Sequence, residues 1–195
     1  MSLFKKLFNT PKKKETEDLS LGSENLPLDQ IFVQNFIKNN GKFLYCVNLE
    51  EVILNLKNIV KENSWENLIC IDNDLAKLAK TIQLKITENY TENLPFLTSC
   101  EHLIAQNGSI LFSSNQLKEH KISSLSENFI VYATTSQLVK NNGESLTGIK
   151  SRYQGNIPSN ISAIKNYNPN SKEIDFMNYG NTNAKNLYLL LFEDL

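Results

Sequence analysis

Short apolar runs rich in branched and aromatic residues alternate along this chain with segments that carry helix-capping residues. Residues 43–46, 68–71, 110–112, 130–133 and 187–191 have the composition of buried β-strands. Strands that alternate with helices favour a mainly parallel sheet, because a parallel pair needs a crossover connection that packs on the sheet. The sequence therefore predicts an α/β fold with a mainly parallel sheet flanked by helices.

Three helices are expected among the first strands. A helix of about ten residues is predicted around residues 31–37, where apolar side chains recur at helical spacing. Asn48 begins a capping box for a second helix over 49–63, and the polar residues 72–74 cap a third helix over 75–80. We expect these three helices to pack on the faces of the sheet.

Composition limits the classes of function. A length of 195 residues with 41% hydrophobic content suits one domain, and a net charge of −1 gives no field that would attract nucleic acid. Cys46, Cys70 and Cys100 are too widely spaced for a disulfide framework or a metal site, so we expect no metal, no cofactor and a reducing cytoplasm. No pair of glycines has the spacing of a dinucleotide-binding turn.

The first 27 residues differ in character from the rest. Leu3, Phe4, Leu7 and Phe8 lie at helical spacing with lysines between them, and the lysines 12–14 follow. This segment is too short for a signal peptide or a membrane span. We interpret 1–27 as a flexible basic tail and linker, with weak membrane-surface contact through residues 1–14 as one hypothesis, and 28–195 as a single α/β domain.

Polar groups are densest between residues 97 and 113. Small hydroxyls, one thiol, one carboxylate, one imidazole and a lone glycine lie here between two apolar runs. A strand, turn, strand passage would present these groups to a ligand at the carboxyl ends of the sheet strands. A short helix over 100–105 that merely caps the sheet is the alternative.

The same stretch resembles the LUD domain family, found in lactate utilisation proteins of the LutC and LutB type. The resemblance lies in the order of residues: Cys100, Glu101, the Ile104-Ala105 pair, Gly108 and Ser109 match the family pattern. Gln106 and Asn107 depart from it, because the family usually has an acid followed by threonine there. The similarity continues through 128–133, 136–139 and 185–191.

The resemblance implies a fold like that of the NagB, RpiA and CoA-transferase class. It also implies an accessory or ligand-binding subunit in organic-acid metabolism, such as lactate metabolism, with iron-sulfur partner proteins that carry the electrons. Whether the chain is an enzyme stays open. One alternative is a CoA-transferase or sugar-phosphate-isomerase type of enzyme that uses Glu101, since a carboxylate beside small residues can form a thioester. A non-catalytic scaffold is the other alternative.

The predicted ligand site gathers small polar residues around Glu101, which is also the one candidate catalytic residue. Ser159 and Ser162 are included because they follow the Pro158 turn and could fold over the same edge of the sheet. The predicted ligand-binding residues are Thr98, Ser99, Glu101, Asn107, Gly108, Ser109, Ser159 and Ser162.

Overall fold

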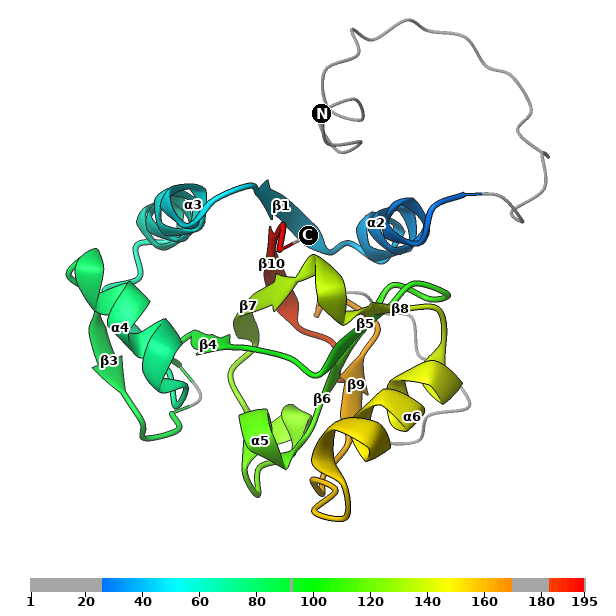
Figure 1. Cartoon of the computed structure of the whole chain (residues 1–195). Helices are drawn as coiled ribbons and strands as arrows, with labels where there is room; N and C mark the ends of the chain where they lie inside the picture. Colours follow the sequence, from blue (N-terminus) through cyan, green and yellow to red (C-terminus); the bar gives the residue numbers. More distant parts are fainter. Residues whose placement is uncertain (1–25, 92, 170–182, 195) are drawn as a thin grey trace, which may run out of the picture.

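The computed structural model describes residues 26–91, 93–169 and 183–194, and its centre is a six-stranded parallel sheet (Figure 1). The strand order is β1-β10-β7-β4-β2-β3, and every neighbouring pair is parallel. The strands are β1 (Lys42–Cys46), β2 (Asn67–Ile69), β3 (Lys85–Thr87), β4 (Phe96–Thr98), β7 (Asn128–Thr134) and β10 (Asn186–Phe192).

Two helices cover one face of this sheet: α3 (Leu49–Glu62) and α4 (Asn73–Thr81). Asn48 caps α3 by accepting a hydrogen bond from the Glu51 backbone N–H at 2.8 Å, as predicted. The Glu51 side chain accepts from the Val47 backbone N–H at 2.9 Å, one residue before the position that a capping box would use. Asp72 caps α4. Alternate strand residues, such as Ile130 and Leu190, point into this apolar layer, because successive side chains of a strand face opposite sides.

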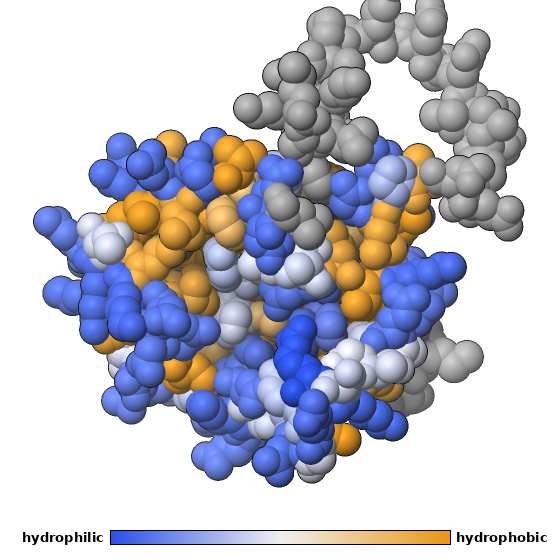
Figure 2. Space-filling model, in the orientation of Figure 1, coloured by the Kyte–Doolittle hydropathy of each residue, from blue (hydrophilic) through white to orange (hydrophobic). Residues whose placement is uncertain are grey.

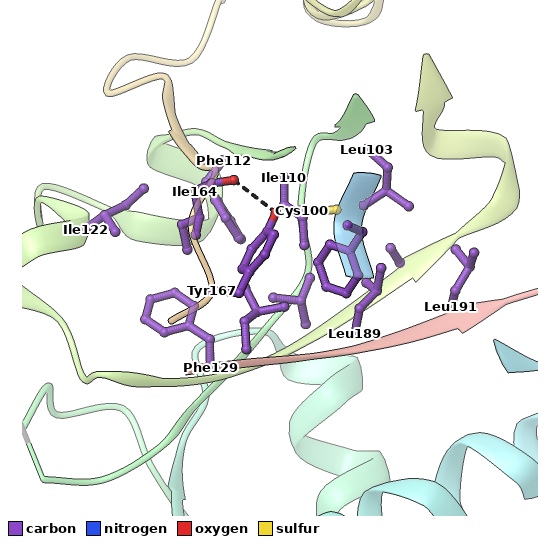
Figure 3. Close-up of a cluster of buried hydrophobic side chains, with 14 of the residues drawn as sticks. Cys100, Leu103, Ile110, Phe112, Ile122, Phe129, Ile164, Tyr167, Leu189 and Leu191 are labelled. Atoms are coloured by element: carbon purple, nitrogen blue, oxygen red, sulfur yellow. Dashed lines mark hydrogen bonds between the residues drawn. The ribbon is translucent and has the colours of Figure 1, made fainter. Parts of the chain in front are cut away.

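The other face packs against α2 (Leu28–Lys38) and a second, four-stranded sheet. That sheet has the order β8-β5-β6-β9, from β5 (His102–Ile104), β6 (Ser109–Phe112), β8 (Leu138–Val139) and β9 (Ser162–Ile164). Figure 3 shows the core between the two sheets, where Leu103 and Ile110 of the small sheet approach Phe129 and Leu189 of the large one. Tyr167 lies among them and donates to the Ile164 carbonyl at 3.0 Å.

Helix α6 (Asn142–Tyr153) lies on the outer face of the small sheet. It packs there through Ile149, which joins Ile104 and Leu111 in a small apolar cluster. The remaining short elements are α5 (Ser114–Leu117) and two 3-10 turns, η1 (Ile122–Ser124) and η2 (Thr135–Gln137).

The predicted α/β class, the parallel sheet and the three packed helices are confirmed. The placement of residues 110–112 in the main sheet is wrong: they form β6 of the small sheet. The tight turn between Ile104 and Ser109 makes β6 antiparallel to β5, whereas a parallel neighbour needs a long crossover. The alternative of a helix over 100–105 is also wrong, because 102–104 form the strand β5.

Polar side chains cover most of the face shown in Figure 2, with apolar areas near α3 and near α2. The exposed large apolar side chains include Leu49 and Leu54 of α3 and Ile37 of α2. Among the residues that the structure describes, every helix is too short or too polar to span a lipid bilayer. The predicted tail lies, up to residue 25, outside the described residues.

Candidate functional site

Glu101 is a buried carboxylate at the point where the chain leaves the main sheet after β4 and enters the small sheet at β5. Its side chain is only 1% exposed. Three residues of one short segment donate to its Oε1 atom: Ser113 Oγ at 2.6 Å, Asn115 Nδ2 at 3.0 Å and Gln116 Nε2 at 3.2 Å. The segment is held in place by its own capping box between Ser113 and Gln116.

Two residues at the end of α6 complete the shell around this carboxylate. Tyr153 OH lies 3.1 Å from Oε2, and Arg152 Nη1 lies 3.4 Å from the same atom. Burial alone raises the pKa of Glu101, but the hydrogen bonds from Ser113, Asn115, Gln116 and Tyr153 outweigh it and lower the pKa below its ordinary value. Glu101 is therefore ionised at neutral pH and joins β5, α5 and α6.

Thr98 and Ser99 lie next to Glu101, as predicted, at the carboxyl end of β4. Thr98 is buried and its hydroxyl donates to the Ser99 carbonyl at 3.1 Å. Ser99 Oγ donates to Asp72 Oδ2, the N-cap of α4, at 3.3 Å. Both hydroxyls therefore have partners within the protein, and the bond from Ser99 ties the end of β4 to α4.

Asn107, Gly108 and Ser109 are not brought together with Glu101. They form the turn at the far end of the β5-β6 hairpin, which starts after Glu101 and turns between Ile104 and Ser109. Asn107 Oδ1 accepts from Ser109 Oγ at 2.6 Å, and Ser109 is fully buried. The turn packs on α2, where Asn39 Nδ2 donates to the Asn107 carbonyl at 2.9 Å. Its polar groups hold the two elements together.

Ser159 and Ser162 lie near the end of β6 that leads into α5, and not near the turn of the β5-β6 hairpin. The Ser159 carbonyl accepts from Ser114 N at 2.8 Å, so this late segment folds against α5, which supplies donors to Glu101. Ser162 pairs with Phe112 at the start of β9. Its hydroxyl donates to Asn160 Oδ1 at 3.5 Å, a local turn contact. The segment is thus joined to Glu101 only indirectly, through α5 and its N-cap Ser113.

The sequence interpretation missed five residues around Glu101. They are Ser113, Asn115, Gln116, Arg152 and Tyr153. One signal could have identified the most informative of them, because Arg152 is the only arginine among the 195 residues. Arginine is suited to paired recognition of carboxylates, so a single arginine in a lysine-rich chain marks a position with a specific role.

His102 follows Glu101 and is only 4% exposed. Its Nδ1 atom lies 3.3 Å from the Gln137 carbonyl, while its buried Nε2 atom has no hydrogen-bond partner among the described residues. Because Nδ1 faces a carbonyl oxygen, we assign the proton to Nδ1, which leaves Nε2 as a bare acceptor. Burial lowers the pKa of His102 below its ordinary value of 6.5.

This pKa shift predicts a pH-dependent stability. Because the folded pKa is below the unfolded value of 6.5, the unfolded chain takes up a proton first as the pH falls. The contribution of His102 to the free energy of unfolding is complete above pH 6.5 and decreases below it, by at most about 1.4 kcal/mol per pH unit. Urea unfolding at several pH values below 6.5 should show that the free energy of unfolding falls less steeply with pH for His102→Gln than for the wild type. An unchanged dependence on pH would contradict the assignment.

Among the described residues, no group of three or more His, Cys, Asp or Glu side chains could hold a metal ion. A cavity of about 580 Å³ lies at the amino ends of β1, β7 and β10, lined by residues that include Lys42, Glu127 and Asn186. It is at the opposite end of the main sheet from Glu101, which follows the carboxyl end of β4.

Comparison with known proteins identifies a family and a similar fold. The sequence model of the LUD domain family matches residues 32–192. The fold resembles the crystal structure of a DUF162 family protein from Deinococcus radiodurans, solved at 1.70 Å, with a TM-score of 0.57 and 9% sequence identity over 87% of this chain and 99% of that chain. At this identity the likeness shows the fold alone. No curated protein matches the chain.

Proposed function

Because the chain belongs to the LUD domain family, we propose that it is an accessory, ligand-binding subunit in organic-acid metabolism, with lactate as one candidate acid. The predicted iron-sulfur partner proteins are part of this proposal. Cys46, Cys70 and Cys100 are all buried free thiols, and burial raises the pKa of Cys70 to about 11. These thiols are poor electron carriers or metal ligands, so electrons from an oxidised acid would pass through partners.

The ion pair between Glu101 and Arg152 carries the proposal. Glu101 holds one amino group of the guanidinium, whereas the Arg152 side chain is 46% exposed. A guanidinium has five N–H donors in a planar fork that matches a carboxylate, so a side chain fixed at one corner can still bind a second carboxylate from solvent. Because Glu101 already balances the charge of Arg152, we expect weak binding, with a Kd of about 1 mM.

The same geometry argues against Glu101 as the nucleophile of an acyl transfer. A nucleophilic carboxylate must reach the acyl carbon, but the Glu101 side chain is 1% exposed and both its oxygens accept several hydrogen bonds. Donors that stabilise the anion also lower its basicity and its reactivity. Glu101 therefore fits the orientation of Arg152 better than it fits covalent catalysis.

Chemical modification offers a direct test, because the chain has one arginine. We expect phenylglyoxal to label Arg152 and small carboxylates such as lactate, pyruvate and propionate to slow the labelling. Isothermal titration of the same acids should show millimolar binding to the wild type and about tenfold weaker binding to Arg152→Lys, which keeps the charge but loses the fork.

The control is Lys150→Ala, which removes an exposed positive charge from the same helix. This variant should keep the affinity if the guanidinium fork matters and lose it if general charge attraction matters. Absence of binding and of protection with every acid would contradict the proposed function and favour the scaffold alternative.

A further inference from the structure

Helix α6 has an unusually small apolar anchor. Of its twelve residues, only Ser145 and Ile149 are buried. Ile149 belongs to a cluster of three buried residues, whereas α3 inserts Val52, Leu56, Ile59 and Val60 into the large core beneath it. Since apolar burial is the main term that docks a helix, α6 is held less firmly than α3.

The sequence of α6 also favours the helix only weakly. Gly148 occupies its interior, where glycine is less favourable than alanine. The packing is close at this glycine: a Cβ atom there would lie 3.0 Å from His102 Nε2 and 3.2 Å from Cε1, so the imidazole would have to shift by a few tenths of an ångström. A residue that weakens the helix thus lies where α6 approaches the small sheet closely.

Polar contacts at the C-terminal end of α6 compensate for the small anchor. Arg152 and Tyr153, in its last turn, bind the Glu101 carboxylate. The chain then turns sharply, because Gln154 has a φ of 34° and Gly155 a φ of 103°. A Cβ atom added at Gly155 would meet nothing within 4 Å, so the turn is not packed against a neighbour at this position.

One buried polar atom beneath α6 has no hydrogen-bond partner in the described part of the chain while the helix is in place. His102 Nε2 is buried against Gly148 and has no hydrogen-bond partner among residues 26–91, 93–169 and 183–194. An unsatisfied buried acceptor is unfavourable, and access to water would remove this penalty. Opening of α6 is therefore opposed by Glu101 and Ile149 and assisted by His102.

We propose that α6 is a movable cover, latched by Glu101, that detaches from the small sheet and exposes His102 and Glu101 while both sheets stay folded. In this proposal the turn at Gln154 and Gly155 is the joint at its C-terminal end. Arg152 and Tyr153 move with the helix, so opening separates the guanidinium from the carboxylate. The proposal does not depend on the binding of an organic acid to Arg152.

Hydrogen-deuterium exchange of the full chain tests the cover. Amides of α6 should exchange at least about tenfold faster than those of α3, with little sensitivity to low urea, because a local opening exposes little surface. Glu101→Gln should accelerate exchange in α6 by about a further tenfold, and the low urea sensitivity of α6 should still distinguish its local opening from the global unfolding that exposes α3. If α6 and α3 exchange with the same rate and the same urea sensitivity, the cover does not exist.

Gly148→Ala provides an independent variant. Helix propensity alone predicts slower exchange in α6, whereas the contact with His102 predicts faster exchange. Ser151→Ala, at an exposed position of the same helix, is the matched control and should not accelerate exchange. Slower exchange in Gly148→Ala would contradict the role of the His102 contact.

Accessibility of His102 gives a second readout. The chain has two histidines, so the variant His120→Gln leaves His102 as the one imidazole that diethyl pyrocarbonate can modify. We expect slow modification of the folded protein, accelerated by about tenfold in a variant that also carries Glu101→Gln. Circular dichroism monitors global unfolding in parallel. If His102 is modified only when the whole protein unfolds, the proposal is overturned, even if either variant proves unstable.

Discussion

Replacement of Gly108 by alanine is expected to lower the free energy of unfolding by about 3–5 kcal/mol. Gly108 has a φ of 65°, a left-handed conformation that residues with a Cβ atom adopt at a cost. The Cβ atom would also lie 2.5 Å from the backbone of Asn35 and Phe36 in α2. Because these are backbone atoms, a side-chain rotation cannot relieve the contact, and urea unfolding should show the full loss.

Gly155→Ala is the matched control for this prediction. Gly155 also has a positive φ, of 103°, but a Cβ atom there would meet nothing within 4 Å. The variant Gly155→Ala therefore measures only the cost of a positive φ in a residue with a Cβ atom, about 1–2 kcal/mol, without a contact like the one that Gly108→Ala makes with α2. Equal losses in the two variants would show that the turn at Gly108 does not pack on α2 as described.

Asn107 and Ser109 show why the turn is structural although its composition resembles that of a binding loop. Small polar residues are selected both by ligands and by tight turns, and the sequence does not distinguish these uses. The decisive fact is the partner: Asn35 Nδ2 donates to the Ala105 carbonyl at 2.9 Å, across seventy positions of the chain. Such a contact depends on tertiary packing, which local patterns do not encode.

The elements that sequence patterns predicted well have local causes. The cap at Asn48 and the N-cap at Asp72 are set by neighbours within three residues, and both were predicted. The strands β3 and β9 were missed because each has three residues, too few to show an alternation of apolar and polar side chains. The division into two sheets was missed for another reason, since strand composition does not specify which strands pair.

Glu101 shows the same limit within the candidate site. Its position at the end of β4 followed from the apolar runs, and its candidacy followed from its charge and small neighbours. Its donors come from α5, twelve to fifteen residues later, and from α6, fifty-one and fifty-two residues later. The sequence interpretation therefore found the carboxylate but described it as open to a ligand, whereas the structure buries it.

The buried network predicts that Glu101→Gln lowers the free energy of unfolding by about 2–4 kcal/mol near neutral pH. Glutamine keeps the shape but places an amide NH₂ group where only acceptors fit, so some of the donors lose their partner. The exposed Glu88 is the control, and Glu88→Gln should change stability by less than about 0.5 kcal/mol.

The pH dependence separates charge from shape in this variant. The folded pKa of Glu101 is lowered, so its contribution is complete above the unfolded pKa, about 4.3, and is lost as the pH falls through the folded value. The difference in stability between wild type and Glu101→Gln should therefore shrink below about pH 4. A difference that does not change with pH would show that shape alone causes the loss.

A comparison with Arg152→Ala decides which contacts of Glu101 matter most. The salt bridge spans 3.4 Å and the arginine side chain is 46% exposed, so its loss should cost only about 1 kcal/mol or less. Glu101 would keep its hydrogen bonds from Ser113, Asn115, Gln116 and Tyr153 in that variant. We expect urea unfolding to rank Glu101→Gln well below Arg152→Ala in stability. The reverse order would mean that the ion pair, and not the neutral donors, holds the carboxylate in the fold.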